Sequence, residues 1–144
     1  MASSLPRTLV IGFIAGALGV LLFHQIVVLI FYAAGLIPFA PYSLAPTPPL
    51  GIPRFLSDTF WGGVWGILLV LLMSRVKAAD RLWVAVVFGA ILLPLVYILV
   101  VLPLKGAPAG PLLAPMVIAF ALIVNGAWGL GTFVFWRLGR RWLG

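Results

Sequence analysis

The stretch LLFHQIVVLIFY (residues 21–32) is an almost unbroken apolar run with a histidine and a glutamine side by side in its middle. It belongs to a longer apolar segment, residues 8–37, that stops at Pro38. A helix of this length crosses a hydrocarbon core roughly 30 Å thick. Because lipid offers the backbone no hydrogen-bond partners, such a segment must be helical. The segment predicts a membrane-spanning helix that carries His24 and Gln25, retained in the protein as a signal anchor.

Three further apolar segments follow the first one. They cover residues 53–76, 80–102 and 115–138. Pro53 is a favourable first helical residue, since the N–H that proline lacks would be unpaired there anyway. Asp80 suits the N-cap position, and Pro94 predicts a kink inside the third segment. The pattern therefore predicts an all-α integral membrane protein with four transmembrane helices.

The composition of the whole chain agrees with a membrane protein. Hydrophobic residues make up 65% of the 144 residues and charged residues only 8%, and the mean hydropathy is +1.29. So little polar surface cannot cover a water-soluble globule. The length fits one domain, residues 1–144, and the absence of cysteine excludes disulfides and thiol chemistry.

The basic residues predict the orientation of the helices. Arg54 and Lys105 adjoin one pair of connections. The other seven lie at the opposite helix ends: Arg7, Arg75, Lys77, Arg81, Arg137, Arg140 and Arg141. This asymmetry predicts that both termini are cytoplasmic, in a bacterial inner (cytoplasmic) membrane, with Trp83, Trp136 and Trp142 at the cytoplasmic interface. The net charge of +7 therefore reflects topology and does not predict binding to nucleic acid.

The two halves of the chain resemble each other. Three motifs recur in the same order: Tyr32…Pro38 with Tyr97…Pro103, PLGIP (49–53) with PLLAP (111–115), and GVWGIL (63–68) with GAWGLG (126–131). They predict two tandem two-helix hairpins, residues 8–76 and 80–138, related by a pseudo-two-fold axis along the membrane normal. The connections 38–53 and 103–115 are rich in proline, and we expect either semi-rigid caps over the helix ends or ordinary loops.

Small residues recur at a spacing of four on every predicted helix. The pairs are Gly12/Gly16, Gly62/Gly66, Ala85/Gly89 and Ala127/Gly131. Such pairs let helix backbones approach closely in a membrane, where no hydrophobic effect drives helices together. They predict either packing inside a four-helix bundle or packing against another chain.

A layer of polar side chains is predicted near the middle of the membrane. At 1.5 Å per residue, His24 lies about 20 Å below Pro38. Trp65 and Trp128 lie at a similar depth, with Asn125 one turn away. We call His24, Gln25, Asn125, Trp65 and Trp128 the polar layer. The repeat equivalent of His24 is Gly89, where we expect room for a side chain or ligand.

The polar layer admits several interpretations. An ionisable group inside a membrane is a functional candidate by default. His24 can instead stay neutral and share hydrogen bonds with Gln25, Asn125 or an indole, which would make a clamp between helices. A path for a solute or proton is one alternative, and a ligand site for haem, another pigment or a quinone is another.

Catalysis is not expected from this chain. A metal site needs three or four ligands, and the chain offers one histidine and two aspartates at opposite faces. A triad of Ser57, Asp58 and His24 would leave the acid roughly a dozen ångströms from the histidine. We therefore expect no catalytic residue, no metal and no cofactor.

Two clusters of charged residues lie near the ends of the predicted helices. Arg54 and Asp58 lie one turn apart and predict an ion pair at the outer interface, or a gate or docking point there. Arg137, Arg140 and Arg141 share one helical face, which suits the head groups of anionic lipids.

We expect a small, non-catalytic membrane subunit or scaffold that packs against itself or a larger membrane complex through its glycine-rich faces. The scarcity of chemical groups favours this function. The alternative is a small oligomeric channel or transporter with the polar layer on its path. A subunit that contacts haem, pigment or quinone is a weaker alternative.

Overall fold

The computed structural model describes residues 5–143 and is 77% helical. Four helices are long and apolar enough to cross a membrane, which confirms the four predicted spans and indicates a membrane location. In chain order these spans cover Leu5–Ala33, Arg54–Arg75, Arg81–Leu104 and Pro115–Leu143. The second span is the single helix α3 and the fourth is the single helix α7.

The other two spans are divided into several elements. The first consists of α1 (Leu5–Leu18), η1 (Gly19–His24) and α2 (Gln25–Ala33). The third consists of α4 (Arg81–Val87), η2 (Phe88–Leu92), α5 (Leu93–Val96), η3 (Tyr97–Val101) and α6 (Leu102–Leu104). The elements η1, η2 and η3 are π-helical. The elements η2 and η3 flank Pro94. Because proline has no N–H to donate, the regular hydrogen bonding of the helix is interrupted there, and the neighbouring turns are wider π-helical ones.

Glycine C-caps end the two spans that lead into the proline-rich connections. Gly35 has a φ of +70°, and the N–H of Leu36 donates to the carbonyl of Phe31 at 2.9 Å. Only glycine adopts this left-handed conformation without steric cost, so the helix stops there. Gly106, with a φ of +62°, ends α6 in the same way, and Pro103 therefore lies inside the helix. The first span therefore ends at Ala33, four residues before the end predicted near residue 37, and the third ends at Leu104, two residues after the end predicted near residue 102.

The second and third spans begin one residue after the predicted starts. Pro53 lies in β2 and α3 begins at Arg54, whose N–H donates to the carbonyl of Ala45 at 2.9 Å. Asp80 occupies the N-cap position before α4, but its carboxylate makes no capping hydrogen bond. The first backbone groups of α3 are thus satisfied by the connection before it.

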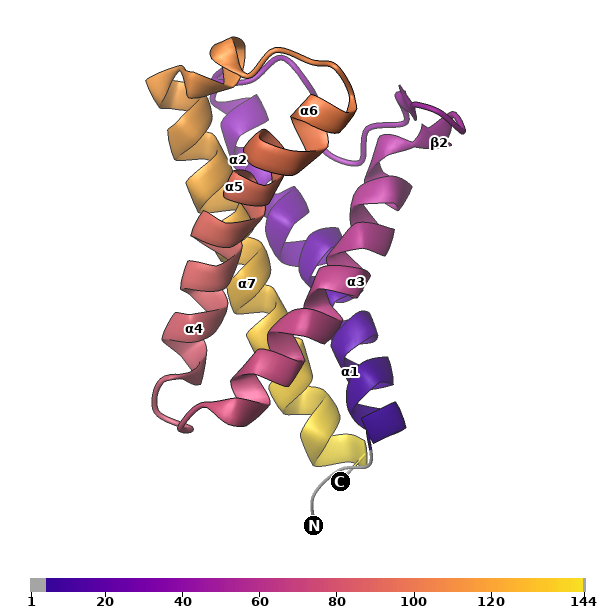
Figure 1. Ribbon diagram of the computed structural model, residues 1–144, viewed down its shortest axis with the longest axis vertical. Helices are drawn as coiled ribbons and strands as arrows, with labels where there is room; N and C mark the ends of the chain where they lie inside the picture. The colour runs from indigo at the N-terminus through magenta and orange to yellow at the C-terminus, as the bar shows by residue number, and fades with distance from the viewer. Residues whose placement is uncertain (1–4, 144) are drawn as a thin grey trace.

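The first span packs closely against the second, the third packs against the fourth, and a contact between the first and fourth spans joins these two pairs. α1 packs along α3, and α7 packs along α4 and η2. α1 and η1 in turn pack against α7, whereas α3 and α4 have little backbone contact beyond the connection between them (Figure 1). The order across the molecule is therefore second, first, fourth and third span. Leu69, Val70 and Met73 of α3 are fully buried in the core, with Ala85 and Trp128.

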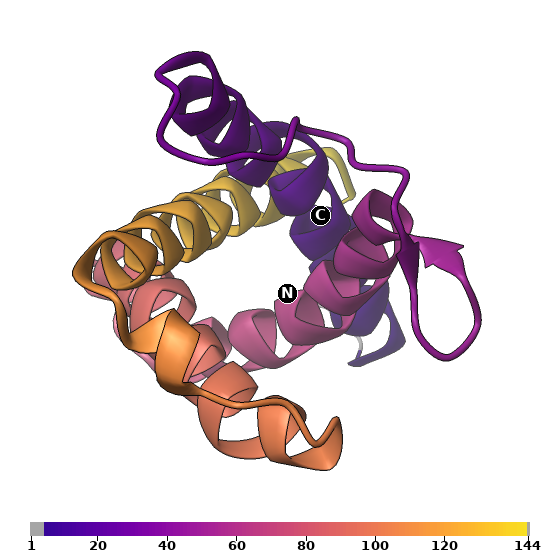
Figure 2. The ribbon, with the colours of Figure 1, turned by 90° about the horizontal axis from the view of Figure 1, so that it is seen from above.

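The connections gather at opposite ends of the molecule. The start of α1, the end of α7 and the α3–α4 connection lie at one end, and both proline-rich connections lie at the other (Figure 1). The first of these folds as a short antiparallel ladder, β1 (Pro46–Thr47) with β2 (Ile52–Pro53), that stands outside the ring of helices (Figure 2). The second contains the 3-10 helix η4 (Gly110–Leu113).

Candidate functional site

Gln25 is bonded to the first outer connection. Its side chain is only 4% exposed, and its Oε1 accepts a hydrogen bond from the backbone N–H of Tyr42 at 2.8 Å. Tyr42 has a φ of +52°, in the left-handed region that residues other than glycine rarely adopt. The connection therefore turns back toward the first span and brings a loop residue to the depth of Gln25.

The π-helical turn η1 supplies a second bond to the same tyrosine. In a regular α-helix the N–H of Gln25 would donate to the carbonyl of Leu21. Here that N–H is directed to the carbonyls of Val20 and Leu22. The carbonyl of Leu21 instead accepts a hydrogen bond from the Tyr42 hydroxyl at 2.6 Å. Tyr42 thus satisfies one backbone group and one side chain of the first span.

Trp128 joins the fourth span to the first. It is 1% exposed, and its Nε1–H donates to the carbonyl of Gly16 at 3.0 Å. A Cβ atom on Gly62 would overlap the side chain of Val20 and lie 3.2 Å from the same nitrogen, so α3 also lies against the indole. The hydroxyl of Thr132 donates to the carbonyl of Trp128 at 2.9 Å. Three spans therefore meet at this tryptophan.

Asn125 and Gly89 close the contact between the third and fourth spans. The Nδ2 of Asn125 donates to the carbonyl of Ala121, one turn earlier in α7, at 2.8 Å. A Cβ atom on Gly89 would overlap the carbonyl oxygen of Asn125. The expectation of free space at Gly89 is therefore wrong, because the backbone of α7 fills it.

The two tryptophans that the repeat aligns have different surroundings. Trp65 is half-buried and its ring meets Phe88 edge to face, with centroids 6.2 Å apart. Phe88 in turn lies 6.4 Å from the ring of Trp128. These aromatic rings fill the space between the second and third spans, whose backbones do not pack closely.

Within the described part of the chain, His24 contributes a buried polar atom without a hydrogen-bond partner to the polar layer. Its Nδ1 atom is buried and has no hydrogen-bond partner among residues 5–143. Three other members of the polar layer do form hydrogen bonds among residues 5–143. These are Gln25, Asn125 and Trp128, and each bonds to a backbone group and not to His24. The five predicted residues therefore do not form one hydrogen-bonded layer.

Most of the small-residue pairs are used inside the chain. A Cβ atom on Gly16 would overlap the carbonyl of Gly62 and lie 2.8 Å from the Cα of Gly66. Gly12 packs against Gly66 in the same way, and a Cβ on Gly131 would meet the ring of Phe23 at 2.7 Å. The corresponding contact between the third and fourth spans involves Ala85, Gly89 and Gly129, while Ala127 is half-buried. These faces are not free for another chain.

The outer charges lie near one another. Asp58 is half-buried on α3, and the positive charges of Arg54 and Lys105 both act on it. Arg54 is the first residue of the same helix, whereas Lys105 follows α6 and comes from the second outer connection. The ion pair between Arg54 and Asp58 stays a prediction, with Lys105 as an additional charge.

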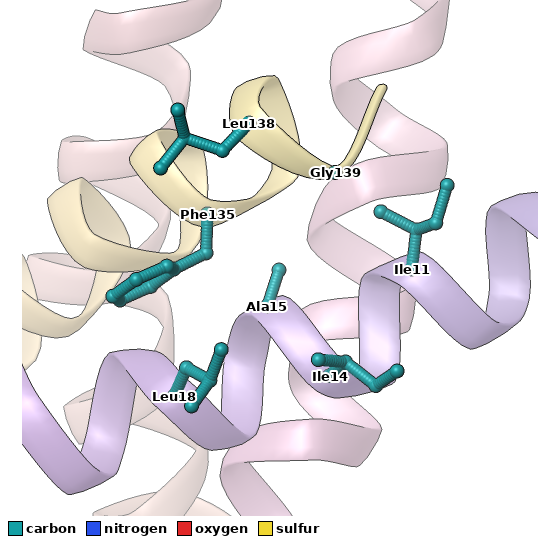
Figure 3. A pocket seen from close by; sticks show the side chains of 7 residues that line it. All are labelled: Ile11, Ile14, Ala15, Leu18, Phe135, Leu138 and Gly139. Atoms are coloured by element: carbon teal, nitrogen blue, oxygen red, sulfur yellow. The ribbon is translucent and has the colours of Figure 1, made fainter. Parts of the chain in front are cut away.

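A shallow apolar hollow lies between α1 and α7 (Figure 3). Its volume is about 190 Å³. The residues around it are Ile11, Ile14, Ala15, Leu18, Phe135, Leu138 and Gly139. Since every one of these side chains is apolar, the hollow suits a hydrocarbon chain and offers no group for chemistry.

A larger pocket lies at the end of the molecule where α7 ends. We call it the arginine pocket, and its volume is about 400 Å³. It is lined by Ala78, Arg81, Phe133, Trp136, Arg137, Arg140 and Arg141. The sequence predicts that the last three arginines share one face of a helix. For Arg81 it indicates only that this end of the helix is cytoplasmic. Trp136, expected at the membrane interface, is 5% exposed at the base of this cluster, whereas Trp83 is largely exposed; Trp142 lies outside the described side chains.

Comparisons with protein-family models, with curated proteins and with solved structures found no match for this chain.

Proposed function

We propose that the chain is a small, non-catalytic membrane subunit, a scaffold that packs against itself or against a larger membrane complex. The observation that supports this most is the use of polar side chains within the spans. Gln25, Asn125 and Trp128 each form a hydrogen bond with a backbone group. The bonds of Gln25 and Trp128 join segments that are far apart in the sequence, and the bond of Asn125 lies within α7, so all three support a structural role for these side chains.

The proposed association surface is the third span, since the glycine faces are occupied internally. Only 11% of its most apolar window is buried, against 28% to 33% for the other spans. Leu95 and Leu99 lie on this outward face, and Leu99 is 69% exposed. Its central turns are also irregular around Pro94. A partner helix would cover a face that otherwise only lipid covers.

We also propose an orientation with both termini in the cytoplasm of a bacterial cell. The start of α1, the end of α7 and the α3–α4 connection share one end of the molecule (Figure 1), and that end carries most of the basic residues. The tandem repeat is supported by the sequence motifs alone. The close contact between the first and fourth spans has no counterpart of similar extent between the third and second, as a two-fold relation would require.

Site-specific photo-crosslinking tests the scaffold proposal. A photoreactive amino acid placed at Leu95 or Leu99 is expected to give one discrete adduct in the native membrane, either with a second copy or with another subunit. Leu68 on α3, which is also exposed, is the matched control and is expected to give none. A monomer in mild detergent, with no adduct from either third-span position, would contradict the proposal.

The second candidate is an oligomeric channel or transporter, and the unpaired, buried Nδ1 of His24 favours it. A polar atom without a partner in a membrane span is a place where water or a solute gains a hydrogen bond. Proton or solute flux into vesicles that is lost in His24→Gln would favour this function over the scaffold. A visible spectrum of the same preparation tests the haem or pigment alternative.

A further inference from the structure

The arginine pocket combines four cationic side chains from two parts of the chain. Arg81 follows the α3–α4 connection, and Arg137, Arg140 and Arg141 lie near the end of α7. Of the residues that the structure describes, those lining the pocket include neither of the two acidic residues of the chain. Like charges held together without a counter-charge repel one another, so an anion from outside the chain would relieve the repulsion.

Two of the guanidinium groups are held in place by their surroundings. The Cζ of Arg81 lies 5.5 Å from the centroid of the Trp136 ring, and the Cζ of Arg140 lies 5.1 Å from it. The Nε of Arg81 also donates to the carbonyls of Met73 at 2.9 Å and Val76 at 3.3 Å, at the end of α3. These bonds use only one of the donors of Arg81, which leaves its terminal N–H groups for a ligand.

We propose that the arginine pocket binds the phosphate of an anionic phospholipid. The planar guanidinium group offers paired donors that match phosphate oxygens, and several arginines at one hollow are typical of phosphate recognition. The pocket lies where the membrane spans α3 and α7 end, the level at which lipid head groups lie. A lipid phosphate therefore reaches it without leaving the bilayer, whereas a soluble phosphate must come from water.

The test measures lipid retained by the full-length protein in mild detergent, by native mass spectrometry. Phosphatidylglycerol is titrated against phosphatidylcholine, and inorganic phosphate is added in a separate arm. The pocket variant is Arg137→Gln with Arg140→Gln, because both side chains are exposed and neither forms a hydrogen bond to the described part of the chain. The control is Arg75→Gln with Lys77→Gln, which removes two charges at the same end outside the pocket.

The wild-type protein is expected to retain phosphatidylglycerol in preference to phosphatidylcholine. The pocket variant should bind phosphatidylglycerol at least roughly tenfold more weakly, because it loses the attraction of two basic residues to the anionic lipid. The control variant should change by less than about threefold, because charges outside the pocket act on a bound lipid only over a distance at which salt screens them. An equal loss in both variants, or equal retention of the two lipids, would overturn the proposal. Displacement of the lipid by millimolar inorganic phosphate would assign the pocket to a soluble phosphate instead.

Discussion

At the scale of single residues, polar side chains in this protein complete the hydrogen bonding of the backbone. Tyr42 donates its hydroxyl to the Leu21 carbonyl in the π-helical turn, and its N–H to Gln25. Trp128 donates to the carbonyl of Gly16 in a neighbouring span. In lipid no water replaces such bonds, so each of these side chains has a structural function that its residue type alone does not reveal.

Replacing Gln25 by leucine tests the bond to Tyr42. The Tyr42 N–H would lose its acceptor in a partly buried position, and we expect a destabilisation of roughly 1–2 kcal/mol. Tyr42→Phe removes only the hydroxyl bond to Leu21 and should cost about 1 kcal/mol. Both are measured as free energies of unfolding in mixed detergent micelles. Tyr32→Phe is the control, expected to change stability by less than about 0.5 kcal/mol, and an equal loss there would contradict the assignment.

At the scale of elements, glycines decide how closely the helices approach. α1 and α3 meet at Gly16, Gly62 and Gly66, where backbone atoms occupy the space of a missing Cβ. Gly126 on α7 is different, because a Cβ there would lie 3.4 Å from the Cβ of Ala90, an ordinary contact. The same residue type is thus essential at one position and replaceable at another.

Gly16→Ala and Gly126→Ala should therefore have opposite effects. Gly16→Ala forces α1 away from α3 and is expected to destabilise the protein by roughly 1–3 kcal/mol or more. Gly126→Ala is expected to be neutral or to stabilise by up to about 1 kcal/mol, since alanine favours the helix. Thermal unfolding in detergent measures both. Destabilisation of similar size at both positions would show that the Gly16 contact is not special.

Some element boundaries were predictable from the sequence and some were not. Hydropathy located all four spans, because a membrane helix must be long and apolar throughout. The end of the first span was misplaced because Pro38 was given more weight than Gly35, the stronger signal for a helix C-cap. The π-helical turn before Gln25 has no clear signal in the sequence, since it depends on the tyrosine that satisfies it.

At the scale of the whole molecule, the packing order of the spans was not predictable. The small-residue pairs indicated which faces are close but not which helix each one meets. The residues of the polar layer do not bond to one another as predicted, because depth along a helix does not fix the direction of a side chain. In addition, the first connection folds back and bonds to Gln25. The arginine pocket was recognised only in part, since Arg81 is far from α7 in the sequence.

Because the native chain contains no cysteine, its orientation can be tested with single introduced cysteines. Leu50→Cys lies in the first outer connection and Ala79→Cys in the α3–α4 connection, and both positions are exposed. A membrane-impermeant maleimide is expected to label the first in intact bacterial cells and the second only after permeabilisation. The opposite pattern would reverse the proposed orientation, and the unaltered protein serves as the unlabelled control.

The bonds between Tyr42 and the first span also set an order in time. The ribosome makes Leu21 and Gln25 before it makes Tyr42, so in a newly inserted first helix the Leu21 carbonyl and the Gln25 amide lack the bonds that Tyr42 later donates. Unpaired polar groups are costly in hydrocarbon. The first helix is therefore complete only after the connection that follows it has been synthesised and has folded back, and a chain arrested before residue 42 should hold its first helix in the bilayer less firmly than the finished protein does.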